Sequence, residues 1–201
     1  MTNGARVLFA LVALGLPVQA QLPPAASSIT LKKVDGGPAE LVIGYDSAIN
    51  KGSTLHRRWF VVNDNSCPIA LENLGIQPYD NKGNLDFVPK GTAYTINSVL
   101  AFEIVFATFD VWGERLHNFS LMHVEDIPAG QPLPVKDFSW RGTYDDVRRY
   151  FSAVSFVNKV MTADGKIWRA DTKRIAQKLD EVQLRVSEAG LDRDDIKGAK
   201  R

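Results

Sequence analysis

The stretch VLAFEIVFATFDVW, residues 99–112, carries apolar side chains on both faces of what the sequence predicts to be one β-strand. Successive side chains of a strand point to opposite faces of the sheet. Residues of even number form one face, which carries Leu100, Phe102, Ile104 and Phe106. Residues of odd number form the other face, which is interrupted by Glu103 and carries Val105, Ala107 and Phe109. An antiparallel strand with one face in water should alternate apolar and polar residues, so both faces of this strand must be covered.

Turn residues divide the middle of the chain into short segments of strand-like composition. Clusters of Gly, Pro, Asn and Asp separate apolar runs such as HRRWFVV at 56–62, TAYTI at 92–96 and LHNFSLMHV at 116–124. No long stretch of helical periodicity lies between Pro38 and Trp140. Short strands with this punctuation are typical of sandwiches and barrels. The sequence therefore predicts a mainly β domain over residues 29–168, with antiparallel strands.

The C-terminal part of the chain changes to a helical period. An apolar residue recurs at spacings of four, three and four at Ile175, Leu179, Val182 and Val186. This spacing predicts one apolar stripe on an amphipathic α-helix over residues 171–189. Asp171 is a favourable N-cap because its carboxylate can accept the free amides of the first turn, and Gly190 is a natural C-cap.

A hairpin and a charged tail flank this predicted helix. Residues 154–161 and 167–168 lie on either side of Asp164-Gly165, a pair that favours a tight hairpin turn. Residues 190–201, which begin GLDRDDIK, are highly charged and are predicted to fray.

The second apolar face of the 99–112 strand has two interpretations. The apolar stripe of the C-terminal helix can pack on it, which would bury four aliphatic side chains at about 1.5–3 kcal/mol each before entropy is subtracted. Alternatively, this face is a docking surface for another protein and the helix projects elsewhere, so that partner contact could be made through an exposed sheet edge, this face or the helix. The residues predicted to bind a partner are Val105, Ala107, Phe109, Ile175, Leu179, Val182 and Val186.

The N-terminal residues have the three-part pattern of a secretory signal. Arg6 precedes the uncharged apolar run VLFALVALGLPV, and Val18-Gln19-Ala20 offers a cleavage site. A run of about a dozen apolar residues is shorter than the ~20 that a membrane-spanning helix needs. The sequence predicts a signal peptide over residues 1–20, a linker over residues 21–28, and no stable membrane span after cleavage. The alternative is an N-terminal anchor that is not cleaved.

One cysteine is present in the 201 residues, so an exported form would have no internal disulfide. That composition fits the periplasm of a Gram-negative bacterium, or secretion from it, better than a small disulfide-rich module. Cys67 itself is predicted to be a small buried hydrophobic residue.

Two parts of the chain resemble bacterial immunoglobulin-like envelope domains of the FxLYD type. The first is NDNSCPI at 63–69, followed by YDNKG at 79–83, which is similar to the strand, turn and YD-x-x-G hairpin of that family. The second is FATFD at 106–110, followed by DIPAGQ at 126–131. Thr108 stands where the family usually has an aliphatic residue. The resemblance implies an immunoglobulin-like β-sandwich in the cell envelope, with no catalytic residues and a role in interaction or assembly.

Candidates for chemistry are few. The sequence shows no phosphate loop, dinucleotide fingerprint, serine nucleophile elbow or paired-cysteine zinc pattern. His117 and His123 would lie about 20 Å apart in an unbroken strand, too far to share a metal ion, although His123 and Glu125 could both reach one. Adjacent carboxylates such as Asp145-Asp146 fit turns and helix starts. We therefore predict no enzyme, no cofactor and no metal site.

Composition and the tryptophans leave two classes of binding protein. A formal net charge of +1 gives no electrostatic case for nucleic acid. Exposed tryptophans would favour a small-ligand or glycan-binding β-sandwich, and buried ones would count against it; the four are Trp59, Trp112, Trp140 and Trp168. The main prediction is an exported, non-catalytic binding or assembly module that contacts another envelope protein, and the small-ligand or glycan binder is the alternative.

Overall fold

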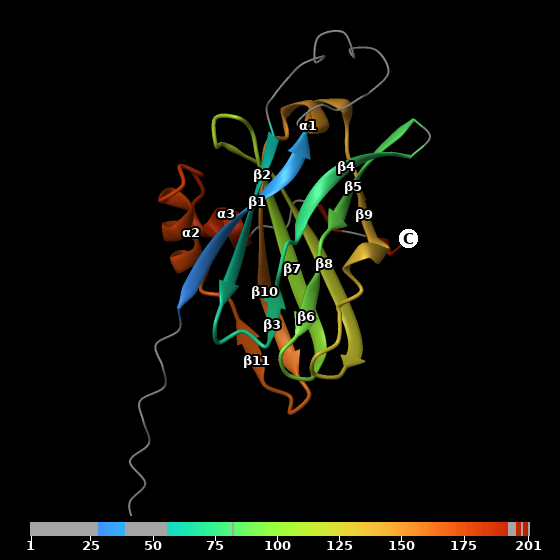
Figure 1. The fold of residues 1–201 in the computed structure, drawn as a ribbon, viewed down its shortest axis with the longest axis vertical. Helices are drawn as coiled ribbons and strands as arrows, with labels where there is room; N and C mark the ends of the chain where they lie inside the picture. The colour runs from blue at the N-terminus through green and yellow to red at the C-terminus, as the bar shows by residue number, and fades with distance from the viewer. Residues whose placement is uncertain (1–27, 39–55, 82, 193–195, 198, 201) are drawn as a thin grey trace, which may run out of the picture.

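The computed structural model describes residues 28–38, 56–81, 83–192, 196–197 and 199–200. Within these ranges the chain is mainly β with antiparallel-rich sheets, as the sequence predicted (Figure 1). The predicted signal peptide over residues 1–20 lies outside the described residues, as does all of the predicted linker except Ser28.

The large sheet has the strand order β1-β2-β10-β7-β8-β12. Its strands are β1 (Ile29–Pro38), β2 (His56–Asp64), β7 (Val99–Phe109), β8 (Arg115–Ile127), β10 (Ser152–Thr162) and β12 (Ile196–Lys197), and β11 (Ile167–Arg169) pairs with β10. Neighbouring strands are antiparallel, except that β2 runs parallel to β10 and β12 runs parallel to β8. β7 pairs along one edge of β10, so β2 and β11 share the other edge, at Ser152–Ser155 and Lys159–Met161 respectively.

The smaller elements complete a sandwich-like arrangement. A second sheet has the order β13-β9-β5-β4, and two short strands pair separately. The strands are β3 (Ile69–Leu71), β4 (Gly75–Asn81), β5 (Asn84–Lys90), β6 (Ala93–Thr95), β9 (Phe138–Arg141) and β13 (Ala199–Lys200). The helices are η1 (Val135–Asp137), α1 (Tyr144–Arg149), α2 (Thr172–Asp180) and α3 (Glu188–Asp192). Figure 1 shows α2 and α3 at one flank of the strands and the β4–β5 hairpin at the opposite flank.

The main core lies between the large sheet and the second sheet. Phe119 of β8 contacts Phe87 of β5 and Trp140 of β9, with ring centroids 4.9 Å and 5.5 Å apart. Phe106, from the even-numbered face of β7, lies 5.6 Å from the Trp140 ring. Aromatic pairs at these separations add to the stability gained from burial alone.

A buried hydrogen-bond chain joins β2, β4 and the end of α1. Trp59 Nε1 donates to the Tyr150 hydroxyl at 2.9 Å, and this hydroxyl donates to the Ile76 carbonyl at 2.6 Å. The indole of Trp59 lies directly over Gly75, where an added Cβ would stand 2.1 Å from Trp59 Cδ2. Glycine at position 75 therefore allows β4 to approach the indole.

The odd-numbered face of β7 is covered by the C-terminal part of the chain. Val105, Ala107 and Phe109 are buried against Ile175 and Leu179 of α2. We call this cluster the second core; it also contains Ile29, Phe60, Val62, Val154, Phe156, Leu184 and Leu191. The intramolecular interpretation of the apolar face is the one that the fold adopts.

The helix α2 is shorter than the helix predicted over residues 171–189. It begins as expected, because the Asp171 side chain accepts a hydrogen bond from the Arg174 amide at 3.0 Å. It ends at Asp180, and Gln183 then takes a positive φ of 63°. The next residues bury Leu184 and pair Arg185 N with the Gly113 carbonyl at 3.0 Å. Tertiary packing thus overrides a local pattern that would continue the helix.

The predicted fraying tail over residues 190–201 is also corrected in part. Leu191 of α3 is buried in the second core, and Asn118 Nδ2 of β8 donates to the Gly190 carbonyl at 2.7 Å. Beyond α3, β12 pairs with β8 and β13 pairs with β9. The prediction of fraying rested on charge density alone. Charge density does not show whether the backbone of a segment can pair with the edge of a neighbouring strand.

Candidate functional site

The seven residues predicted to bind a partner do not form an exposed surface in this structure. Val105, Ala107, Phe109, Ile175 and Leu179 are buried in the second core. Val182 and Val186 are half-buried against the same core. The physical reason is that α2 and the chain after it supply the cover that β7 needed. Exposed apolar surface lies farther along the same face of the sheet, beyond the end of this cover.

Two rows of side chains cross four strands in register at the uncovered end. Val124 of β8, Ala101 of β7, Met161 of β10 and Ile167 of β11 form the first row, and Met122, Glu103, Lys159 and Arg169 of the same strands form the second. Side chains directly opposite one another on adjacent strands have Cβ atoms about 4.5–5.5 Å apart. The rows line a groove of about 180 Å³, which we call the apolar groove.

The large apolar side chains of the groove are exposed. Val124 is 77% exposed, Met122 58%, Ile167 56% and Met161 38%. Single exposed apolar residues are common on protein surfaces, but a contiguous set on a rigid sheet is typical of a binding surface. The groove is therefore the first candidate site.

A β-bulge at Asn158 turns Lys159 and Met161 toward the groove. Before it, Val154 and Phe156 face the second core, and after it Val160 faces the main core. One extra residue in a strand reverses the alternation of the side chains that follow. If the side chains of SAVSFVNKVM alternated without a bulge, Lys159 and Met161 would face the main core. The sequence pattern therefore did not reveal this surface.

Glu103 is a buried carboxylate at the floor of the groove. It accepts hydrogen bonds from Ser120 Oγ at 3.0 Å and Asn158 Nδ2 at 2.8 Å, and Lys159 Nζ lies 3.2 Å from its Oε2. Buried charges are tolerated when they are paired and hydrogen-bonded. Glu103 therefore holds the bulged strand β10 against β7 and β8.

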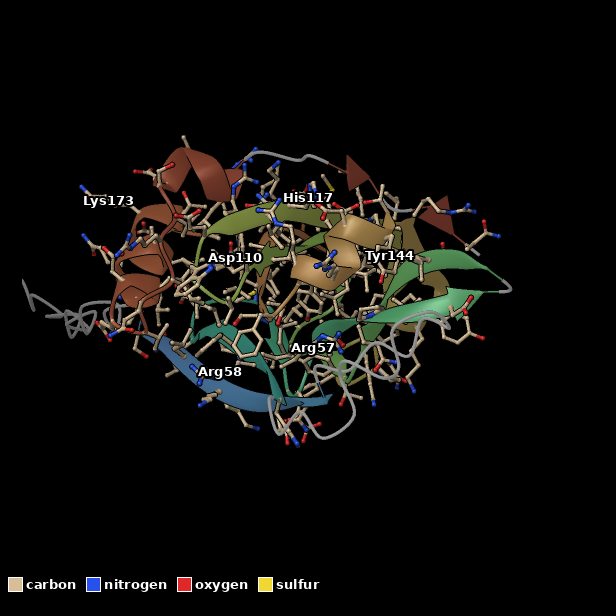
Figure 2. The ribbon with its side chains drawn as sticks, turned by 90° about the horizontal axis from the view of Figure 1, so that it is seen from above. Arg57, Arg58, Asp110, His117, Tyr144 and Lys173 are labelled. Atoms are coloured by element: carbon tan, nitrogen blue, oxygen red, sulfur yellow. The ribbon has the colours of Figure 1, made fainter. Side chains whose placement is uncertain are left out.

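A second candidate site lies at the opposite end of the same strands. A cleft of about 490 Å³ separates the β7–β8 turn from the loop that follows α2. Its lining includes Arg58, Asp110, Trp112, Asp180, Gln183 and Arg185. Figure 2 looks down on this end of the molecule and labels Arg58 and Asp110. We call it the Trp112 cleft.

The turn that carries Trp112 is rigidly built. Asp110 Oδ1 accepts hydrogen bonds from the backbone amides of Trp112, at 2.9 Å, and Glu114, at 3.0 Å. Gly113 has a φ of +79°, and an added Cβ there would stand 2.4 Å from the Gln183 carbonyl oxygen. The indole of Trp112 is nevertheless 80% exposed. Trp59 and Trp140 are buried and Trp168 is half-buried, so Trp112 alone of the four meets the expectation for an exposed stacking platform.

The other titratable groups considered from the sequence are structural in their surroundings. His117 Nε2 lies 2.7 Å from Asp146 Oδ1, and His123 Nε2 lies 2.6 Å from Glu125 Oε2. Burial raises the pKa of Asp146, but hydrogen bonds from Thr143 and His117 outweigh it and leave that pKa below its usual value. Asp146 and Thr143 form the capping box of α1, which explains this geometry without catalysis.

The described ranges contain no cluster of three or more His, Cys, Asp or Glu side chains arranged to hold a metal ion. No helix within them has both the length and the apolar composition that crossing a membrane requires. Cys67 is buried with a free thiol, as predicted.

No protein-family model matches the chain. Comparisons with the curated proteins and with the solved structures also give no match. Function is therefore inferred from the geometry of the two surfaces.

Proposed function

We propose that this protein is an exported, non-catalytic binding module of the bacterial cell envelope, and that the apolar groove docks a segment of another envelope protein. The observation that carries the proposal is the exposure of Met122, Val124, Met161 and Ile167 side by side on paired strands. Burying such surface stabilises a complex by roughly 25 cal/mol per Å² before association costs are subtracted. Rigid strands lose little conformational entropy when they bind.

The charged row of the groove favours an acidic occupant. Lys159 is neutralised by Glu103. Arg169 is exposed, and no carboxylate among the described residues pairs with it. A guanidinium at the edge of an apolar groove matches a carboxylate beside apolar side chains. The occupant that fits is an amphipathic protein segment with apolar residues and one acidic residue.

An immunoglobulin-like sandwich and an envelope location belong to the same proposal. Two sheets that share one core, together with the short resemblance at 63–69, 79–83, 106–110 and 126–131, support the fold. The signal-like pattern over residues 1–20 supports export to the periplasm of a Gram-negative bacterium. A single buried cysteine is compatible with an oxidising compartment, because it is shielded from disulfide exchange.

Site-specific photo-crosslinking in the producing cell tests this proposal. A photoreactive amino acid replaces Met122 in one variant and Gln177, which is exposed on α2, in a control. We expect one protein to crosslink through position 122 and not through position 177. Mass spectrometry should place the crosslink in a segment with apolar residues and an acidic residue, and the substitutions Val124→Asp and Arg169→Glu should each weaken it.

Two results would contradict the proposal. Equal crosslinking from positions 122 and 177 would show that the groove is not specific. A crosslinked product made of two copies of this chain would show that the groove mediates self-association and does not dock another protein. The variant Arg58→Gln, which alters the other candidate site, serves as the matched charge control and should leave the crosslink unchanged.

A further inference from the structure

The Trp112 cleft has the chemistry of a ligand site that is separate from the apolar groove. It lies where β7 ends and β10 begins, whereas the groove lies where β7 begins and β10 ends. We propose that this cleft binds an acidic saccharide, a sugar ring that carries a carboxylate. The proposal goes beyond the protein-docking function and does not depend on it.

Trp112 supplies an exposed stacking face on a turn whose backbone is held by hydrogen bonds. Two backbone amides of the turn donate to Asp110, which fixes the position of the Trp112 backbone at the edge of the cleft. The face of an aromatic ring carries partial negative charge and attracts the C–H groups on the apolar face of a sugar ring. An indole that is 80% exposed on a rigid turn leaves this face open to a ligand.

Two guanidinium groups supply the charge. The Arg58 guanidinium lies 5.6 Å from the centroid of the Phe151 ring. The backbone of Arg58 pairs with that of Ser152 in β10. Arg185 is held by its amide, which donates to the Gly113 carbonyl at 3.0 Å. Among the described residues, neither guanidinium has a carboxylate partner. Arginine binds carboxylates with two parallel hydrogen bonds, which makes it well suited to an acidic ligand.

The balance of the lining favours a sugar over an aromatic acid. Trp112 is the exposed aromatic side chain of the lining, whereas Phe60 is buried and Phe151 is half-buried. The walls also include Asp180 and Gln183, which can accept hydrogen bonds from hydroxyl groups, and Gln183 can donate to them as well. Asp110 Oδ1 is taken up by two amides of its own turn, and among the described residues no ion pair joins Arg58 or Arg185 to Asp110 or Asp180, so both guanidinium groups are open to a carboxylate of the ligand. A ligand with one apolar face, a hydroxylated rim and a carboxylate that reaches these guanidinium groups matches this arrangement.

Tryptophan fluorescence of the full chain tests the proposal. Glucuronate, galacturonate, N-acetylneuraminate and muramate are titrated to tens of millimolar beside their neutral counterparts, with benzoate as an aromatic acid. We expect at least one acidic sugar to shift the emission of the parent protein and to have no effect in Trp112→Ala. Arg58→Gln and Arg185→Gln should each lower the affinity for that sugar by about tenfold, the value of one charge-assisted hydrogen bond.

The variant Arg169→Gln removes an exposed arginine from the apolar groove and is the matched control. It should leave the fluorescence titration unchanged, and circular dichroism should confirm that every variant folds. No response to any of the four acidic sugars, or an equal response in Trp112→Ala, would overturn the proposal. Equal affinity for the neutral sugars, or tighter binding of benzoate, would overturn the assignment of the ligand class.

Discussion

The thiol of Cys67 shows how burial alone sets the chemistry of a single residue. Burial raises its pKa to about 12, because a thiolate in the core would lose its hydration. In the unfolded chain the same thiol titrates near 9.0. Between these two values the folded protein holds a proton that the unfolded protein has released, so folding becomes less favourable as the pH rises.

We predict that Cys67→Ala makes the free energy of unfolding less sensitive to alkaline pH. The parent protein should lose about 2 kcal/mol from this one group between pH 7 and pH 10.5, since each unit above the unfolded pKa contributes about 1.4 kcal/mol. The variant should lack that loss, although removal of the buried sulfur lowers its stability at pH 7. Urea unfolding at both pH values measures the difference. Parallel pH dependences of parent and variant would show that the thiol does not titrate as burial requires.

Individual residues also show which parts of the candidate sites could be predicted from the sequence and which could not. The burial of Cys67 follows from its type and its place in an apolar run. The orientation of Met161 does not, because it depends on the bulge at Asn158, which the composition of β10 does not signal. The exposure of Trp112 depends on an Asp110 side chain that caps its own turn. The apolar groove was therefore not predicted at the level of named residues, and for the Trp112 cleft the sequence named only Trp112, as one of four tryptophans that could be exposed.

The helix α2 shows which features of an element are local and which are not. Its start was predicted, because Asp171 caps amides only three residues away. Its end was not predicted, because it depends on contacts with residues far away in the sequence. Leu184 packs in the second core, and the Arg185 amide donates to the Gly113 carbonyl. The sequence did predict that both faces of β7 are covered, because both carry apolar side chains. The free-energy cost of exposing those side chains to water is the same whatever element covers them.

We predict that Leu179→Ala destabilises the protein by about 2–5 kcal/mol, because Leu179 is fully buried between α2 and the large sheet and its loss leaves a cavity. Gln177→Ala, on the exposed face of the same helix, should change the stability by less than about 0.5 kcal/mol. Denaturant unfolding of both variants measures the contrast. Similar small effects would mean that α2 is not part of the cooperative core, and would return Val105, Ala107 and Phe109 to the list of docking residues.

The whole molecule depends on a strand from its C-terminal third. β10 lies between β2 and β7 in the large sheet, and its inward side chains complete the main core. We predict that a chain ending at Tyr150 does not fold, because β2 and β7 would have no neighbour to join them. A chain ending at residue 192 retains β10 and the second core and should fold. Near-ultraviolet circular dichroism and the cooperativity of thermal unfolding distinguish the two. A cooperative transition in the shorter chain would contradict the central role of β10.

The late position of β10 in the chain determines when the large sheet can close during synthesis. β2 ends at Asp64 and its parallel partner begins at Ser152, so β1 and β2 leave the ribosome long before their permanent neighbour. At ordinary rates of synthesis the wait is on the order of ten seconds. Throughout it, the apolar strand WFVV has an open edge that can pair with other chains. The large sheet can therefore close only after residues 152–162 are available, however early β1 and β2 pair with each other.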